Sequence, residues 1–430
     1  MKILAATSIL LLAATSLSAQ AIDHIINPDA VEKIERTLSS DDMQGRQTFK
    51  PGIEKAADYI EREFRTAGLQ PLKGSRSYRQ PFSMFRTKLT TASATLDGQP
   101  LTTGSLGVAV VSNAQHIQMD DHSGYEKVII KAGSNVFVEA MHYIHEKKNY
   151  LVLVDTSFTK QFARLSNFSR QQFKSDNNVI FLLTTLNPTS YSVTAEQEVT
   201  ESKLANVVGI LPGKSKKNEY VIFSGHYDHL GVTKPNEKGD SVYNGANDDA
   251  SGTTAVIMLA NYFARTRSNE RTLVFAAFTA EEIGEYGSQY FSSQFDPATV
   301  MAMFNIEMIG TASKWGPNSA FITGYERSDM AKILEKNLAG SGFSFHPDPY
   351  PDQQLFYRSD NASLARQGVP AHTISTFEID VDKHYHTLDD DIDHLDMKNM
   401  AAIIRSIAIS SKTIVEGKDT PSRVDTTQLR

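Results

Sequence analysis

The segment TLVFAAFTAEEIGEYGSQYF (residues 272–291) contains the pattern on which the predicted fold of this chain depends. Its mostly apolar run 272–278 predicts a buried strand, and a helix is expected over 285–293. Between them lie two adjacent glutamates, Glu281 and Glu282, whose like charges repel each other and resist burial. The segment therefore predicts a strand followed by a helix, with an acidic pair at the carboxyl end of the strand.

The same alternation of strands and helices extends over most of the chain beyond residue 203. Further strands are expected near 220–225, 300–306 and 370–376, and helices over 251–265, 327–339 and 397–415. This order predicts an α/β fold, with a central mixed, mostly parallel sheet flanked by helices. In such sheets, functional side chains lie beyond the carboxyl ends of the strands.

Polar groups that can bind a metal follow the expected strands. The motifs are SGHYDHLG (224–231), NGANDDASG (244–252), FTAEE (278–282), FNIEMIG (304–310) and DKHYHTLDDD (382–391). Carboxylates in a partly dry crevice cannot all stay ionised unless a cation neutralises them. Two imidazoles and three carboxylates suit a pair of Zn²⁺ ions better than one ion. A dication beside the Glu281–Glu282 pair would stabilise it, with one glutamate binding metal and the other free for proton transfer.

Each motif also has an ordinary structural explanation when it is taken alone. A histidine at a strand end is usually hydrogen-bonded, Asp249 or Ser251 can cap a helix, and paired glutamates suit a first helical turn. The acidic run 389–393 lacks the central glycine of an EF-hand loop, and HEKKN (145–149) lacks the second histidine of the helical zinc motif. The occurrence of all the strand-end motifs together, in order, favours the metal site.

The first 21 residues have the pattern of a secretory signal peptide. Lys2 precedes an apolar stretch that ends in small residues, and cleavage is expected after Ala21 or Ala19. An uncleaved membrane anchor is disfavoured because the apolar stretch is short. We therefore expect an exported protein, periplasmic or secreted, without a membrane anchor.

The composition excludes several other classes of protein. The chain of 430 residues is 40% hydrophobic and 22% charged, which is typical of a globular protein. It contains no cysteine, so a cysteine nucleophile and thiolate metal ligands are excluded. A net charge of −7 without a long basic run gives no sign of nucleic-acid binding. The oligomeric state is not predicted.

The chain is expected to have a discontinuous main domain. Residues 96–199 change to short β-rich runs and predict a smaller inserted domain, which interrupts a main domain made of 22–95 and 200–418. The last residues, 419–430, form a polar tail that is expected to be disordered.

In their order and residue types, these motifs resemble peptidase family M28, whose members are co-catalytic zinc peptidases and mostly aminopeptidases. The segments LSSDDMQGR (38–46) and PGIEKAADYIEREFRTAGLQPL (51–72) are similar to the family's lead-in segment. The stretch RSDNASLARQGVPAHTIST (358–376) resembles the part before the last ligand. More weakly, 96–199 resembles the protease-associated insertion of some members.

The resemblance implies a ligand set for two zinc ions. His226 would bind the first ion, Asp248 would bridge both, and Glu282 would bind the second together with His386. Glu307 stands where many members have Asp, and it would complete the first site. Both residues offer oxygen ligands, so binding is expected to survive, although the extra methylene of Glu307 would shift that metal or change its affinity.

Two further roles follow from the same resemblance, and one ligand position has a competitor. Asp228 would accept the other imidazole N–H of His226 and fix its tautomer. Tyr385 would donate a hydrogen bond to the oxyanion. His384 is the competitor of His386, but only His386 fits the YHT pattern of the family.

The resemblance implies an aminopeptidase that acts on peptide substrates through a metal-bridged hydroxide, with Glu281 as general base and acid. The alternatives are a carboxypeptidase or dipeptidase of the same fold, a glutaminyl cyclase that uses one zinc for acyl transfer, and a non-catalytic binding module. A binding module is disfavoured because every ligand position holds a residue able to bind metal. The residues that bind the substrate side chain are not predicted.

Overall fold

The structure, a computed structural model, describes residues 22–429. The expected signal peptide lies outside the described residues. The chain divides into a main unit, made of the described parts of Met1–Pro81 and Ala205–Arg430, and an inserted unit, Phe82–Leu204. Within 22–429, no helix combines the length and the apolar character needed to cross a membrane.

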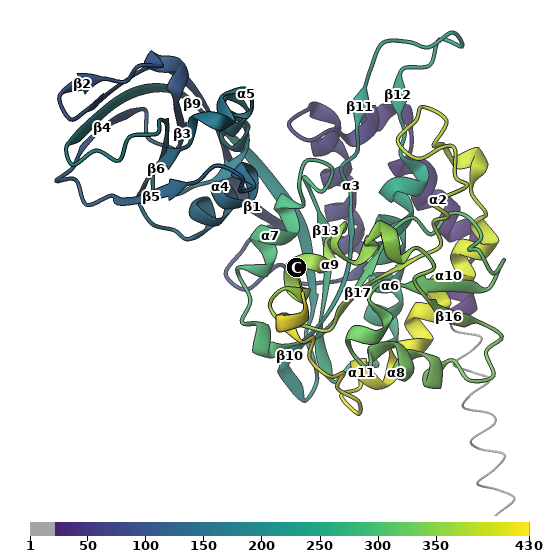
Figure 1. Ribbon diagram of the computed structural model, residues 1–430. Coiled ribbons are helices and arrows are strands. Elements are labelled where there is room, and N and C mark those ends of the chain that lie inside the picture. The colour runs from purple at the N-terminus through teal and green to yellow at the C-terminus, as the bar shows by residue number, and fades with distance from the viewer. Residues whose placement is uncertain (1–21, 430) are drawn as a thin grey trace, which may run out of the picture. The chain divides into compact units, whose positions relative to one another are not determined.

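The main unit is built on a mixed sheet with the strand order β16-β15-β17-β14-β10-β13-β9 (Figure 1). The strands are β9 (Tyr191–Leu211, which enters from the inserted unit), β10 (Lys216–His226), β13 (Arg271–Phe278), β14 (Val300–Ile306), β15 (Ser319–Ile322), β16 (Ser344–Pro347) and β17 (Ala371–Ser375). β10 is parallel to both β13 and β14, and β14 is parallel to β17. The predicted mixed, mostly parallel α/β sheet is confirmed.

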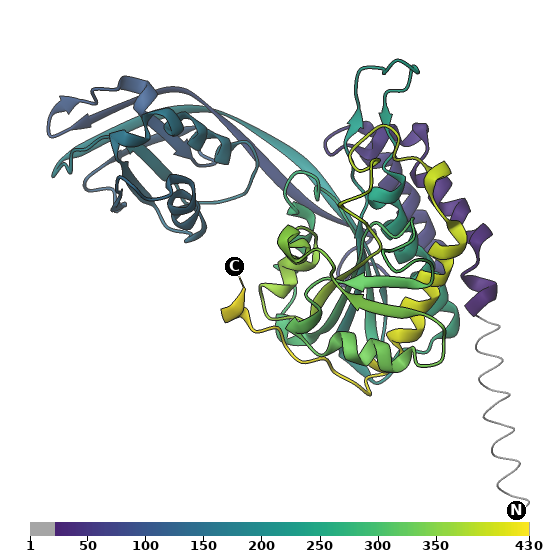
Figure 2. The ribbon, with the colours of Figure 1, turned by 45° about the vertical axis from the view of Figure 1, so that its right-hand side comes forward.

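Helices cover both faces of this sheet (Figure 2). They are α2 (Pro28–Leu38), α3 (Pro51–Ala67), α6 (Ser251–Thr266), α7 (Tyr286–Ser292), α8 (Met330–Asn337), α9 (Asn361–Ala365), α10 (Met397–Ser410) and α11 (Lys412–Val415). Alternate residues of β13 point to opposite faces, so Phe275 packs in the core with α2, α3, α6 and α10, whereas Val274 packs with α7 and α9. Both faces of the strand are therefore buried, as its continuous apolar run predicts.

The register of the strands places the expected site at one edge of the sheet. His226 at the end of β10 pairs with Phe278 at the end of β13, and Ser224 pairs with Asn305 of β14. Since these parallel strands end side by side, the residues that follow them enter the same region. A small hairpin of β11 (Gly231–Val232) and β12 (Val242–Tyr243) follows β10.

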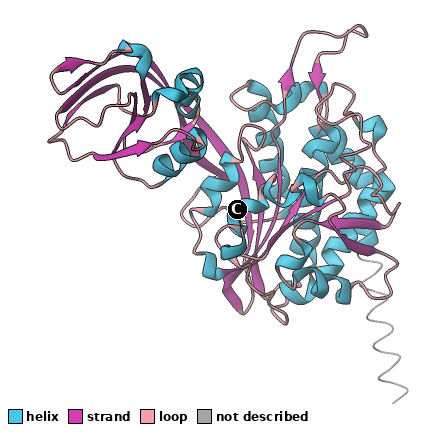
Figure 3. Cartoon of the chain, viewed as in Figure 1, coloured by secondary structure: helices cyan, strands magenta, loops and turns pink. Residues whose placement is uncertain are grey.

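The inserted unit contains a four-stranded sheet with the order β3-β8-β6-β5 (Figure 3). Its elements are β1 (Arg79–Leu96), β2 (Gln99–Pro100), β3 (Val108–Val111), β4 (His116–Asp120), β5 (Glu126–Ile130), α4 (Val136–His145), β6 (Tyr150–Val154), α5 (Thr159–Phe162), β7 (Gln172–Phe173) and β8 (Val179–Leu183), besides the start of β9. One face of the sheet packs on β1, β4 and β9, and the other on α4 and α5. The unit begins earlier than the expected 96, because most of β1 packs within it.

The C-terminal tail is ordered up to residue 429, and the expectation of disorder is wrong. The buried guanidinium of Arg271 donates to the carbonyl oxygen of Asp419 at 2.7 Å. Arg423 donates to the carbonyl oxygen of Val300 at 2.7 Å, and the Val424 side chain is buried. These contacts hold a polar segment that has little apolar surface of its own.

A buried carboxyl group, Glu35 on α2, lies in the core of the main unit. Its Oε2 accepts a hydrogen bond from Thr254 at 2.8 Å, and its Oε1 has no hydrogen-bond partner among the described residues. Burial raises the pKa of Glu35 from 4.5 to about 8 because it penalises the charged form. The folded protein therefore binds this proton more tightly than the unfolded chain does.

From this we predict that Glu35→Gln flattens the pH dependence of stability. Because the folded pKa is raised, the wild type loses stability as pH rises from about 4.5 to about 8, whereas glutamine does not titrate. The variant should gain on the order of 4 kcal/mol relative to wild type between pH 4 and pH 9. Urea unfolding in chelator measures this, with the exposed Glu32→Gln of the same helix as control. Parallel curves for wild type and Glu35→Gln would contradict a neutral Glu35.

Candidate metal centre

The structure brings the predicted ligands together at the carboxyl ends of β10, β13 and β14. His226 ends β10, Glu282 follows β13 and Glu307 follows β14. Asp248 lies in the loop before α6, and His386 lies in the loop before α10. Parallel strands joined through helices thus collect side chains from distant parts of the chain.

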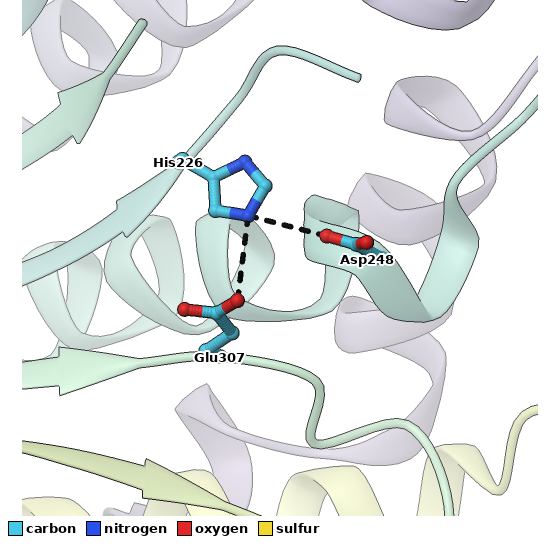
Figure 4. Close-up of side chains that lie close together, drawn as sticks. All are labelled: His226, Asp248 and Glu307. Atoms are coloured by element: carbon cyan, nitrogen blue, oxygen red, sulfur yellow. Dashed lines mark ion pairs between the residues drawn. The ribbon is translucent and has the colours of Figure 1, made fainter. Parts of the chain in front are cut away.

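One group of possible ligands consists of His226, Asp248 and Glu307 (Figure 4). The Nε2 atom of His226 lies 3.2 Å from Oδ1 of Asp248 and 3.7 Å from Oε1 of Glu307. This Nε2 is buried and has no hydrogen-bond partner among the described residues, although it faces two carboxylates. The other oxygen of Glu307, Oε2, accepts a hydrogen bond from the hydroxyl of Ser359. Such an orphaned nitrogen among oxygen ligands fits a metal ion.

A second group surrounds the other oxygen of Asp248. Nε2 of His386 lies 3.1 Å from Oδ2 of Asp248 and 3.2 Å from Oε2 of Glu282. His229 joins this group, with its Nδ1 atom 2.7 Å from Oε1 of Glu282. Asp248 therefore faces one group with each carboxylate oxygen, as a residue shared by two metal ions would.

The side chain of Asp228 does not contact His226 in the expected way. Nδ1 of His226 lies 3.1 Å from the backbone carbonyl oxygen of Asp228 but 3.8 Å from its carboxylate. The carboxylate instead accepts hydrogen bonds from the backbone N–H of Glu281 at 3.1 Å and from the hydroxyl of Thr48 at 3.0 Å. The expected partner of the imidazole is thus corrected from the carboxylate to the carbonyl, and the carboxylate holds the turn after β13.

His384 and His386, both in the loop before α10, have different neighbours. The ring of His384 stacks on His394 with a centroid distance of 4.1 Å, whereas His386 faces Asp248. Tyr385 stacks on the ring of His386 at 3.9 Å. The structure thus places His386, and not its competitor, at the centre, with Tyr385 beside it.

Sequence analysis missed His229, which lies in the quoted motif HYDHLG. The signal was the second histidine of SGHYDHLG, three residues after His226, to which the sequence analysis assigned no role. His229 has a side chain that is 0% exposed, and its ring meets that of His386 at a centroid distance of 5.8 Å.

Arg46 is the second residue that sequence analysis missed. Its buried guanidinium donates to the carbonyl oxygens of Tyr227 at 2.9 Å, Asn244 at 2.5 Å and Gly245 at 2.8 Å. It therefore joins the loop after β10 to the loop that carries Asp248. Nothing in the local pattern of QGR (44–46) signals contacts with residues so distant in the sequence.

The charges of the centre compensate one another without a metal. Burial would lower the pKa of His226, but the carboxylates of Glu281 and Asp248 raise it well above its ordinary value. Burial also lowers the pKa of His386, and its contacts with Asp248 and Glu282 outweigh this and raise the pKa to about 10. Burial likewise raises the pKa of Glu281 well above its usual value. Protons thus neutralise the metal-free cluster, and a dication would replace them.

A small cavity of about 50 Å³ adjoins the centre. Glu307 and Tyr385 contribute to its wall beside the metal ligands. Its apolar lining includes Phe321, Leu355, Phe377 and Ile379. Arg358 also lines it and is the basic residue among the lining side chains. The arrangement offers an apolar recess next to the polar edge that carries the possible metal ligands.

The fold and these two groups define an α/β protein with two groups of possible metal ligands at one edge of its sheet. Residues 206–410 match the model of peptidase family M28. A probable zinc metalloprotease of Pyricularia oryzae is 37% identical over 113 residues, which are 26% of this chain and 22% of that protein. A probable leucine aminopeptidase of Trichophyton verrucosum is 29% identical over 208 residues, 45% of this chain and 53% of that protein. The chain thus spans between about a fifth and about a half of these relatives.

Solved structures show the same fold. A zinc aminopeptidase from Bacillus subtilis matches with a TM-score of 0.55 and 15% identity, covering 93% of this chain and 98% of that one. An aminopeptidase from Aneurinibacillus sp. strain AM-1 matches with a TM-score of 0.53 and 16% identity, covering 92% and 96%. At these identities, the likeness supports the fold.

Proposed function

We propose that this chain is an exported di-zinc metallopeptidase, an aminopeptidase that removes N-terminal residues from peptides. The observation that carries the proposal is the position of Asp248, whose two oxygens face two separate groups of buried ligands. Relatives named as zinc metalloprotease and leucine aminopeptidase support the metal and the activity. The signal-like pattern of residues 1–21 supports export.

The residues present fit two zinc ions. His226, Asp248 and Glu307 would hold the first, and Asp248, Glu282 and His386 would hold the second. Zinc, when bound, acts as a Lewis acid that activates water and polarises the scissile carbonyl. Nitrogen and oxygen donors at two adjacent positions are the ligands that such ions prefer.

Glu281 would move the proton. Its Oε2 lies 3.9 Å from Nε2 of His226, and its side chain is 13% exposed, so it faces the centre while being largely shielded from solvent. Burial raises its pKa, so the carboxyl can accept a proton from the attacking water and deliver it to the leaving amine. Asp228 fixes the backbone of Glu281 through the N–H hydrogen bond, and the hydroxyl of Tyr385 would donate to the oxyanion.

The apolar cavity beside Glu307 and Tyr385 would take the side chain of the substrate's N-terminal residue. We therefore expect cleavage of peptides with apolar first residues to be faster than cleavage of peptides that begin with Lys or Arg, because Arg358 lines the cavity and repels a cation. Comparing kcat/KM across a series of peptides that differ only in the first residue measures this preference. Equal rates for Leu and Lys at this position would exclude the cavity as the binding site.

The proposed activity is tested with a panel of peptides that have free or blocked N-termini, assayed with and without chelator. Release of the first residue from free peptides only, abolished by chelator and restored by zinc, is expected. Release of C-terminal residues from blocked peptides would instead indicate a carboxypeptidase, and cleavage restricted to dipeptides a dipeptidase. Formation of pyroglutamate from N-terminal Gln would indicate a cyclase. Metal binding without any turnover would indicate a binding module.

We predict that Glu307→Ala loses one metal ion and keeps the other. Glu307 belongs only to the group of His226, so the contacts of His386 with Asp248 and Glu282 should remain intact. Removing a ligand should weaken the first metal at least about 100-fold, more than the loss of an outer-shell contact does. Titration of metal-free protein with zinc measures both affinities, with the exposed Glu326→Ala as control. Two tight sites in Glu307→Ala would contradict its role as ligand.

A further inference from the structure

The two oxygens of Glu282 have different partners. Oε2 lies 3.2 Å from Nε2 of His386, on the side of Asp248 and the proposed second zinc. Oε1 lies 2.7 Å from Nδ1 of His229, whose ring is completely buried. A carboxylate on a flexible three-bond side chain is therefore held at one oxygen while the other faces the metal position.

We propose that His229 is a positioning residue for the second zinc: its Nδ1–H donates to Oε1 of Glu282 and thereby fixes Oε2 toward the metal. This inference rests on the proposed di-zinc function. It assigns His229 to one of the two metal positions only, since its polar contact within the centre is with Glu282, which belongs to the second group.

The distances favour a hydrogen-bond donor over a direct metal ligand. An ionised carboxylate only accepts hydrogen bonds, so an imidazole nitrogen 2.7 Å from Oε1 of Glu282 carries the hydrogen. Nδ1 in this tautomer has no lone pair free for a metal, whereas the other ring nitrogen, Nε2, keeps its lone pair and is buried without a hydrogen-bond partner among the described residues. The same Nδ1 lies 3.9 Å from Oδ2 of Asp248, beyond hydrogen-bond distance. His229 therefore acts on the metal through Glu282.

The surroundings fix the ring of His229 in this orientation. Its backbone N–H donates to the carbonyl oxygen of Arg46 at 3.2 Å, and its ring meets the His386 ring at 69°. Gly245, at a φ of +55°, packs against the ring, and an added Cβ there would lie 2.4 Å from Cδ2 of His229. A side chain at Gly245 would thus displace the imidazole, so the glycine makes room for the contact with Glu282.

The ligands at the two proposed metal positions are therefore oriented by different contacts. At the first, the backbone carbonyl of Asp228 orients the imidazole of His226. At the second, the imidazole of His229 orients the carboxylate of Glu282. Loss of the His229 contact should consequently weaken the second metal selectively and leave the first almost unchanged.

The test uses three substitutions of His229 in the full chain. His229→Asn keeps an N–H donor near the position of Nδ1, His229→Gln moves the donor toward the position of Nε2, and His229→Leu removes it. His384→Gln is the matched control, because His384 stacks on His394 outside both groups. Zinc titration of metal-free protein by calorimetry gives the two affinities, and thermal unfolding of the metal-free variants reports on their folding.

We expect His229→Asn and the control His384→Gln to bind both zinc ions like wild type, within about 3-fold. His229→Gln and His229→Leu should weaken binding of the second zinc by roughly 10- to 100-fold and leave the first unchanged. If His229→Asn binds the second zinc as weakly as His229→Leu, the donor role is overturned in favour of direct ligation or simple space filling. Unchanged affinities in His229→Leu, or equal loss at both sites together with a lower melting temperature without metal, would also overturn it. Wild type that binds two zinc ions but cleaves no peptide would refute the proposed activity and leave this assignment standing.

Discussion

Glu281→Gln should lower kcat by roughly 10²- to 10⁴-fold while both zinc ions remain bound. Glutamine has the size of glutamate but cannot accept the proton of the attacking water. Glu281 is not a member of either ligand group, although it lies next to Glu282 in the sequence. The proposed roles thus separate proton transfer from metal binding between two adjacent residues, so their substitutions should have different effects.

Steady-state kinetics on a peptide with a free N-terminus and elemental analysis of the purified variant together test this expectation. Glu270→Gln is a suitable control because Glu270 precedes β13 at the opposite edge of the sheet, where it accepts a hydrogen bond from Ser215. Near-normal turnover of Glu281→Gln with two zinc ions bound would exclude Glu281 as general base. Loss of zinc from the variant would instead make it a ligand.

The pattern of strands and helices could be predicted from the sequence wherever apolar periodicity was continuous. The run 272–278 became β13 (Arg271–Phe278), and the helix expected at 251–265 became α6 (Ser251–Thr266). A strand buried on both faces and a helix that ends near a polar turn leave local signals. Because parallel strands share one edge, the approximate position of the candidate site followed from the order of these elements.

Contacts between residues distant in the sequence left no such signal. The guanidinium of Arg46 donates hydrogen bonds to carbonyl groups about 180 to 200 positions further along the chain. The C-terminal tail is held by Arg271, whose place in the sequence pattern is that of an ordinary strand residue. The role of His229 depends on which way its ring turns, and Gly245 helps to decide that. The sequence could predict that Asp228 lies near the imidazole of His226. Only the backbone geometry shows that the carbonyl oxygen of Asp228, and not its carboxylate, is the partner of Nδ1.

Asp248→Ala is expected to weaken both zinc ions at once, by more than Glu307→Ala weakens either. Oδ1 of Asp248 lies 3.2 Å from Nε2 of His226, and Oδ2 lies 3.1 Å from Nε2 of His386, so one substitution removes a ligand from each group. Burial opposes the charge of Asp248, yet its contacts with His226 and His386 hold the pKa well below the usual range, so the carboxylate stays ionised.

A bridging carboxylate also reduces the repulsion between two dications. Without it, binding of one zinc ion should weaken binding of the other. Zinc titration of Asp248→Ala should give no site within about 100-fold of the wild-type affinities, and peptide cleavage should fall to background. Asp248→Asn keeps the shape and one oxygen, so it should retain one metal more tightly than the alanine variant. If Asp248→Ala kept one zinc at wild-type affinity, Asp248 would serve a single metal and would not be the shared ligand.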